Sequence, residues 1–147
     1  MKMLTLIGAT LISMGAVASD KGLADFTTDG CSMFPDGTPE QPTLWQNCCV
    51  LHDIAYWQGG SFQQRLQADK ALAACVTALG KLDLAKVMFA GVRVGGSPYL
   101  PTSYRWGYGW AFPRGYKVVS DIERTQINAK LKHVSHIKIL DVTEAVQ

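Results

Sequence analysis

The chain lacks a strong charge of either sign, and it lacks internal repeats. Its 147 residues include 14 Lys and Arg against 12 Asp and Glu, which leaves a formal net charge of +2 at pH 7. A general nucleic-acid-binding protein carries a large basic excess, so that class is excluded. Disorder is excluded as well, because 48% of the residues are hydrophobic, an ordinary share for a globular domain.

Long hydrophobic runs are scarce, and the one that is present stands at the N-terminus. After one cation, residues 3–18 are mostly apolar, but this run is shorter than the roughly 20 residues that span a bilayer. It ends in A-V-A, a small-x-small pattern typical of signal peptidase sites. We therefore expect residues 1–18 to be a signal peptide and residues 19–147 to form one exported domain, secreted or periplasmic. No cysteine precedes Cys31, so the predicted cleavage site is not that of a lipoprotein.

Cysteine is rare too, and the four present are Cys31, Cys48, Cys49 and Cys75. An exported chain folds in an oxidising compartment, so disulfides are favoured over a metal cluster. Four cysteines allow three pairings. A bond between the neighbours 48 and 49 would be strained, which leaves two pairings: 31–49 with 48–75, or 31–48 with 49–75.

Caps and glycine pairs predict two adjacent helices in the middle of the chain. The first is expected from about Leu44 to Trp57, with Thr43 as its cap. The second is expected to begin after Ser61, with Gln64 completing a capping box, and to end at Gly80. Because the connection between them is so short, the two helices should be antiparallel neighbours.

The remainder of the chain is expected to be partly helical. Apolar content predicts a third, partly buried helix over residues 81–93, and residues 121–131 are expected to form a fourth helix. Between them, residues 95–115 are rich in Gly, Pro and alternating aromatic residues, which favours a hairpin or an extended ribbon. The predicted fold class is therefore mainly α: an antiparallel, disulfide-linked helix pair followed by an aromatic-rich extended C-terminal segment.

Residues with catalytic chemistry are concentrated on the first predicted helix. At 3.6 residues per turn, Cys48, His52 and Tyr56 share one face, whereas Cys49 and Asp53 share the adjacent face. The relation of these faces to the second helix depends on which cysteines pair.

A disulfide between Cys48 and Cys75 would turn the first of these faces toward the second helix. From this bridge, His52 lies about 6 Å along the first helix and Tyr56 about 12 Å. Asp69 lies about 9 Å along the second helix in the same direction, so it can accept hydrogen bonds from both. The other pairing would rotate this face by about 100°. We therefore predict the 48–75 and 31–49 disulfides.

These contacts would suit ester hydrolysis. A histidine held by a carboxylate at one ring nitrogen keeps its other nitrogen free to act as a general base. Asp53 would point toward the loop that Cys31 holds near the helix, and a Gly- and Pro-rich loop can supply backbone carbonyls to a hard cation such as calcium. A base for water and a cation for the developing oxyanion together make a hydrolytic site.

Two motifs resemble those of the secreted phospholipase A2 family. The stretch C-C-V-L-H-D-I-A-Y at residues 48–56 is similar to the family signature C-C-x-x-H-D-x-C-Y. Upstream, D-G-C-S at residues 29–32 is similar to the family's calcium loop, and the segment around Asp69 resembles its second long helix. The resemblance covers roughly residues 29–79 and is closest to the compact, bacterial type.

The resemblance implies an activity and assigns the catalytic residues. His52 would be the general base, Asp69 its orienting partner and Tyr56 a support for Asp69. The implied reaction is calcium-dependent hydrolysis of the sn-2 acyl ester of glycerophospholipids, with a phospholipid membrane surface as the substrate. The family's paired cysteines at two further positions are Ala55 and Ala68 here, and their joint absence leaves two disulfides.

The resemblance also implies calcium as the cofactor. Asp53 would be the carboxylate ligand, and backbone carbonyls of the loop would complete the shell. By offset from Cys31, these carbonyls belong to Gly30, Ser32 and Phe34. The N–H of Ser32 would help to stabilise the oxyanion. The loop departs from the family pattern, since residues 32–37 read S-M-F-P-D-G in place of a glycine-rich run.

Other interpretations fit parts of the sequence. A non-catalytic lipid- or protein-binding module could use the same scaffold, although such modules usually lack the calcium-binding Asp that is retained here as Asp53. A zinc site made from Cys48, Cys49 and His52 would lack a suitably spaced fourth ligand. The aromatic residues and cations over residues 93–117 either dock on a bilayer or pack on the helix pair, and packing is the favoured interpretation.

Overall fold

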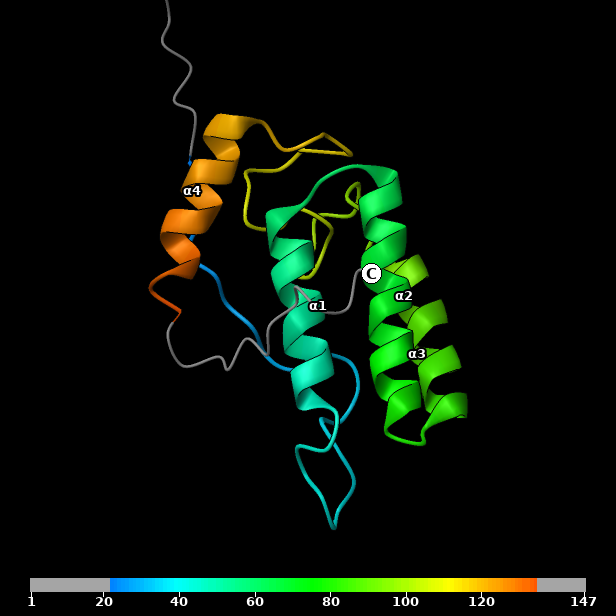
Figure 1. Ribbon diagram of the computed structural model, residues 1–147. Coiled ribbons are helices and arrows are strands. Elements are labelled where there is room, and N and C mark those ends of the chain that lie inside the picture. The colour runs from blue at the N-terminus through cyan, green and yellow to red at the C-terminus, as the bar shows by residue number, and fades with distance from the viewer. Residues whose placement is uncertain (1–21, 135–147) are drawn as a thin grey trace, which may run out of the picture.

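The computed structural model describes residues 22–134, so the predicted signal peptide lies outside the described residues. Within this range the fold is mainly α, as predicted, and no strand is present. Figure 1 shows the four helices, which are α1 (Gln46–Gln58), α2 (Phe62–Ala78), α3 (Leu82–Gly95) and α4 (Asp121–Leu131). None of these described helices combines the length and hydrophobicity that a membrane span requires.

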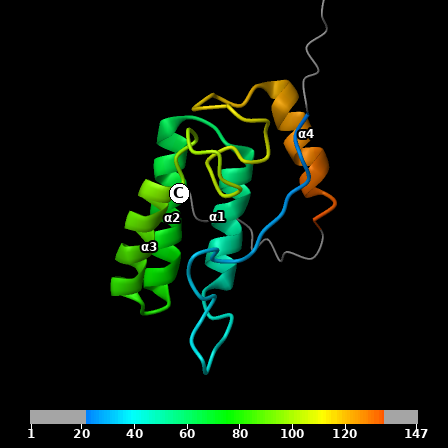
Figure 2. The same ribbon diagram turned by 180° about the vertical axis from the view of Figure 1, so that it is seen from behind.

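The helices form two groups around α1. Helices α1 and α2 pack together as an antiparallel pair, and α3 returns along α2. Helix α4 lies on the opposite side of α1, as the view from behind confirms (Figure 2). Helix α1 is therefore central, and residues on its different faces contact different parts of the chain.

The start of α2 follows its local sequence, whereas the start of α1 does not. The Ser61 hydroxyl accepts the Gln64 N–H and the Gln64 side chain accepts the Ser61 N–H, which confirms the predicted capping box. The predicted cap at Thr43 is wrong, because α1 begins after Trp45 without a side-chain cap. The reason is tertiary: the indole of Trp45 donates to the carbonyl of Pro35 at 2.6 Å and its backbone N–H donates to Asp36, so the upstream loop sets the start of the helix.

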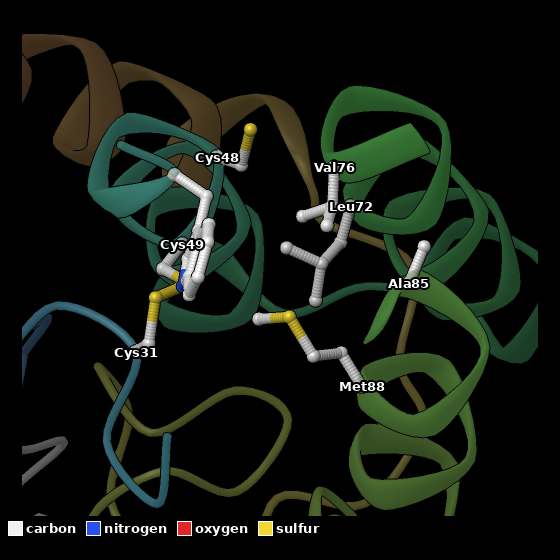
Figure 3. Close-up of a cluster of buried hydrophobic side chains, with 8 residues drawn as sticks. Cys31, Cys48, Cys49, Leu72, Val76, Ala85 and Met88 are labelled. Carbon is white, nitrogen blue, oxygen red and sulfur yellow. A yellow bond between two sulfur atoms is a disulfide. The ribbon is translucent and has the colours of Figure 1, made fainter. Parts of the chain in front are cut away.

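Both predicted disulfides are present. Cys48 joins α1 to Cys75 of α2 with a Cα–Cα distance of 5.8 Å, and Cys31 joins the upstream loop to Cys49 with a distance of 5.0 Å. Neither Cys48 nor Cys49 is therefore free to supply a thiolate to a metal ion. The bridges lie in a core where side chains of α1, α2 and α3 point toward one another (Figure 3). The buried apolar members from the two later helices are Leu72, Val76, Ala85 and Met88.

The predicted aromatic hairpin or ribbon does not form. Between α3 and α4 the chain consists of turns and irregular backbone. The indole N–H groups of Trp106 and Trp110 donate to the carbonyls of Gly60 and Gln58, and the N–H of Gly107 donates to the carbonyl of Tyr56. The segment thus satisfies backbone carbonyls at the C-terminal end of α1 instead of pairing with itself.

The aromatic residues of this segment differ in burial, and Tyr108 and Tyr116 are half-buried. Trp106 and Trp110 are only 2% and 8% exposed, so the packing interpretation holds for these two. Trp110 belongs to a second core between α1 and α4, whose other buried members are Leu23, Trp57, Val119 and Ile127. Tyr99, Tyr104 and Phe112 remain exposed at the surface.

Candidate active site

The predicted contacts among His52, Asp69 and Tyr56 are present. His52 Nε2 lies 2.9 Å from Asp69 Oδ1, and the Tyr56 hydroxyl donates to the same oxygen at 2.8 Å. The His52 and Tyr56 rings also pack on each other, with centroids 4.2 Å apart. The Cys48–Cys75 bridge fixes the depth at which α1 faces α2, which is why the two side chains on α1 meet one carboxylate on α2.

The second oxygen of Asp69 is bound by an arginine that the sequence analysis did not identify. Arg93 Nη1, from α3, donates to Asp69 Oδ2 at 2.5 Å, and Arg65 Nε lies 3.9 Å from that oxygen. Arg65 precedes Asp69 by four residues on one helix, a spacing that could have indicated the pair. Arg93 lies on another helix, and no local pattern in the sequence identifies it.

These contacts keep Asp69 ionised although its side chain is fully buried. Burial alone would raise the pKa of Asp69, but hydrogen bonds from His52, Arg93 and Tyr56 lower it below its ordinary value. Burial, together with the nearby charge of Asp69, raises the pKa of Tyr56, so the tyrosine is a neutral donor. With an ionised acceptor at Nε2, the neutral imidazole carries its proton on that nitrogen.

Arg65 connects the same carboxylate to the surrounding backbone. Its Nε donates to the Tyr56 hydroxyl at 3.0 Å and its Nη1 to Tyr116 at 2.6 Å. Its Nη2 donates to the carbonyls of Val92 and Arg93, both at 2.8 Å. One buried guanidinium therefore holds the C-terminal end of α3 against α1 and α2.

Asp53 lies on the adjacent face of α1 in a different electrostatic environment. Its Oδ2 accepts a hydrogen bond from the Thr28 hydroxyl at 2.6 Å. Burial raises the pKa of Asp53 to about 7; Thr28 lowers it, and the charges of Asp29 and Asp36 raise it further. A cation beside this group would reverse the effect, since an opposite charge favours the ionised carboxyl.

The loop before α1 is held in an unusual backbone conformation. Asp36 accepts hydrogen bonds from the N–H of Cys31 at 2.8 Å and from the side chain of Gln46 at 3.0 Å. Gly30 has a φ of 75°, and a Cβ there would lie 2.3 Å from the Asp36 carboxylate, so only glycine fits. Ser32 also has a positive φ, 53°, which is uncommon for a residue with a side chain.

A cavity of about 370 Å³ joins the loop to the histidine. His52 and Asp53 line it, and so do all three loop residues proposed to supply carbonyls, which are Gly30, Ser32 and Phe34. The remaining wall is largely apolar and includes Leu72 from α2 and Met88, Val92 and Val94 from α3. Asp69 is not in the wall, because it lies behind the histidine. A smaller, more polar cavity of about 190 Å³ shares Ser32, Asp53 and Tyr104 with it.

The oxygen atoms around Asp53 are of the kind that bind a hard cation. One carboxylate and three loop residues line the same cavity, and calcium favours carboxylate and carbonyl oxygens. Burial raises the pKa of Asp53, and the nearby charges of Asp29 and Asp36 raise it further and add negative potential at this place. The donor set therefore fits calcium.

The imidazole of His52, bound to the Asp69 carboxylate, lies in the wall of an apolar cavity. Beside it lies the carboxyl group of Asp53, which has no cationic partner among the described residues. Such a site can activate water next to an apolar substrate. Comparison with known proteins identifies no relative, since no family model, curated protein or solved structure matches the chain.

Proposed function

We propose that the chain is a calcium-dependent phospholipase A2 of the compact, bacterial type, which hydrolyses the sn-2 acyl ester of glycerophospholipids. The observation that carries the proposal is the 2.9 Å contact between the buried Asp69 and His52, which lines an apolar cavity that Asp53 also lines. The motif resemblance over residues 29–79 supports the same reaction.

In this proposal His52 is the general base. Its Nε2 is bound to Asp69, and Nδ1 has no hydrogen-bond partner among the described residues. Nδ1 takes a proton from water as the water oxygen attacks the ester carbonyl, and it returns the proton to the departing glycerol oxygen. Asp69 remains ionised throughout and stabilises the imidazolium that forms between these two transfers.

The loop would stabilise the charge that develops on the carbonyl oxygen. No described residue accepts a hydrogen bond from the N–H of Ser32, so this donor is available to an oxyanion. Calcium held by Asp53 and the carbonyls of Gly30, Ser32 and Phe34 would supply positive charge at the same place. Asp53 must be ionised to bind it, which makes binding pH-dependent.

The apolar wall favours a fatty-acyl chain over a polar substrate. The side chains of Met33 and Val94 are 82% and 79% exposed, and both residues line the cavity, so its entrance is apolar as well. An apolar entrance suits a substrate that is drawn from a phospholipid surface. The predicted signal peptide and the two disulfides support an exported enzyme, secreted or periplasmic.

The test is fatty-acid release from mixed phospholipid vesicles, with calcium and with a chelator, for the wild type and His52→Ala. We expect calcium-dependent release that the substitution abolishes. His133→Ala is the matched control, because His133 lies at the surface after α4. No release on any lipid by folded, oxidised protein would contradict the proposal and favour a lipid- or protein-binding module. The departure of residues 32–37 from the family's calcium-loop pattern is the observation that favours this alternative.

A further inference from the structure

The ion pair between Arg93 and Asp69 crosses from one helix to another inside the protein. His52 comes from α1, Asp69 from α2 and Arg93 from α3, so three helices meet at one carboxylate. The Arg93 side chain is 21% exposed, whereas the Asp69 side chain is fully buried. The pair is thus largely shielded from solvent. It therefore differs from a salt bridge between exposed side chains, which contributes little to stability.

Each oxygen of Asp69 has its own donors. Oδ1 accepts from both His52 and Tyr56, and Oδ2 accepts from Arg93. A carboxylate bound at a single oxygen can still turn about its Cβ–Cγ bond. Because Arg93 holds Oδ2, the plane of the carboxylate is fixed, and with it the direction in which Oδ1 faces the imidazole.

Arg93 itself is held at both ends. Its backbone carbonyl accepts a hydrogen bond from Arg65 at 2.8 Å, and its guanidinium lies 5.3 Å from the centre of the Phe62 ring at the start of α2. A cation over an aromatic face is attracted to it, which restricts the side chain further. A planar guanidinium fixed in this way is well suited to orient a carboxylate.

We propose that Arg93 is a positioning residue, which acts through Asp69 to hold the imidazole of His52 in its catalytic orientation. Its neighbours Val92 and Val94 line the apolar cavity while Arg93 binds the carboxylate behind the histidine. Helix α3 therefore connects the wall of the substrate cavity to the orienting group of the base. The catalytic part of this inference rests on the proposed function.

The test compares Arg93→Met and Arg93→Lys with the wild type. Methionine removes the charge and keeps much of the apolar length, whereas lysine restores a cation with a single donor nitrogen. We expect Arg93→Met to lower kcat by up to about 100-fold, the effect of a small misplacement of a catalytic group. KM should change by less than about twofold, because substrate binding is not affected. Arg93→Lys should recover part of kcat.

The matched control is Lys86→Met, which removes a cation from an exposed position on the same helix. A second readout does not need a substrate: the proton NMR resonance of the His52 Nε2–H, which a hydrogen bond to a carboxylate shifts far downfield. We expect this resonance to move or broaden in Arg93→Met and to be unchanged in Lys86→Met.

The outcomes separate this inference from the proposed function. An Arg93→Met protein with wild-type kcat and an unchanged resonance would overturn the positioning role and leave the hydrolase proposal standing. A wild type that hydrolyses no phospholipid would overturn the hydrolase proposal, and the resonance alone would then decide whether Arg93 orients the imidazole. If Arg93→Met does not fold, Arg93→Lys decides on both readouts.

Discussion

Asp69 and Asp53 are both partly or wholly withdrawn from solvent near His52, but their surroundings differ. Asp69 is fully buried and accepts hydrogen bonds from His52, Tyr56 and Arg93, all within 2.9 Å. These donors outweigh the effect of burial, so the pKa of Asp69 is lowered. The polypeptide by itself provides all the positive charge and hydrogen bonds that this carboxylate requires.

Asp53 has a hydrogen bond from Thr28 at 2.6 Å and no cationic partner among the described residues. Burial and the charges of Asp29 and Asp36 raise its pKa to about 7. Two aspartates near the same histidine therefore differ in ionisation because their surroundings differ. Asp69 is held as an anion by its hydrogen-bond donors, whereas Asp53, without a cation beside it, ionises only near pH 7.

The largest effect is expected from Asp69→Asn. The amide keeps the shape but removes the charge that stabilises the imidazolium, and it leaves Arg93 without its counter-ion. We expect hydrolysis to slow by about 100-fold or more, the range for loss of general-base function, with the helical circular dichroism spectrum retained. Asp83→Asn, at an exposed position on α3, is the control. An unchanged rate would show that Asp69 is not the partner of the base.

The intermediate effect is expected from Asp53→Asn. Calcium should raise the melting temperature of the wild type at pH 8 and should leave that of the variant unchanged. The calcium response of the wild type should also weaken as the pH falls through about 7, because protons compete for Asp53. A calcium-dependent shift in the variant would place the cation elsewhere.

The same substitution makes a second prediction without calcium. The pKa of Asp53 is higher in the folded protein, about 7, than its ordinary value of 3.8, so ionisation of Asp53 destabilises the fold. This penalty is absent below about pH 4 and complete above about pH 7. At pH 8 we therefore expect the free energy of unfolding of calcium-free Asp53→Asn to exceed that of the wild type by up to about 4 kcal/mol. Equal free energies of unfolding for the variant and the wild type at pH 8 would contradict the raised pKa of Asp53.

The smallest effect is expected at Glu123, a carboxylate remote from the site that resembles Asp69 in having its own cation. Arg114 donates to it at 3.0 Å, and this bond, together with the Ser120 N–H and Lys117, lowers its pKa to about 2 despite burial. The stabilisation is present above its ordinary pKa of 4.5 and is lost as the pH falls toward 2. Glu123→Gln should cost about 1 kcal/mol at pH 7, with activity unchanged. Thermal melts from pH 7 to pH 2 check this, and a cost that persists at pH 2 would argue against the ion pair.

Much of the helical frame could be predicted because its signals are local. The cap at Ser61 and the bounds of α4 depend on contacts within a few residues, and both agree with the sequence prediction. Where a distant segment competes, local reasoning failed. Thr43 does not cap α1 because Trp45 binds the upstream loop, and the aromatic segment is not a hairpin because Trp106 and Trp110 bind the end of α1.

The sequence by itself determined that His52 and Tyr56 face Asp69, since helical periodicity and one disulfide set the relative depth of two neighbouring helices. It did not determine what binds the other oxygen of Asp69. The contact to Arg93 exists because α3 folds back along α2, and the pKa of Asp53 is raised because its side chain is buried and, to a lesser degree, because Asp29 and Asp36 lie near it. Hydrogen-bond partners and desolvation depend on segments that are far apart in the chain, so only the tertiary structure decided that Asp69 has cationic partners and that Asp53 has none among the described residues.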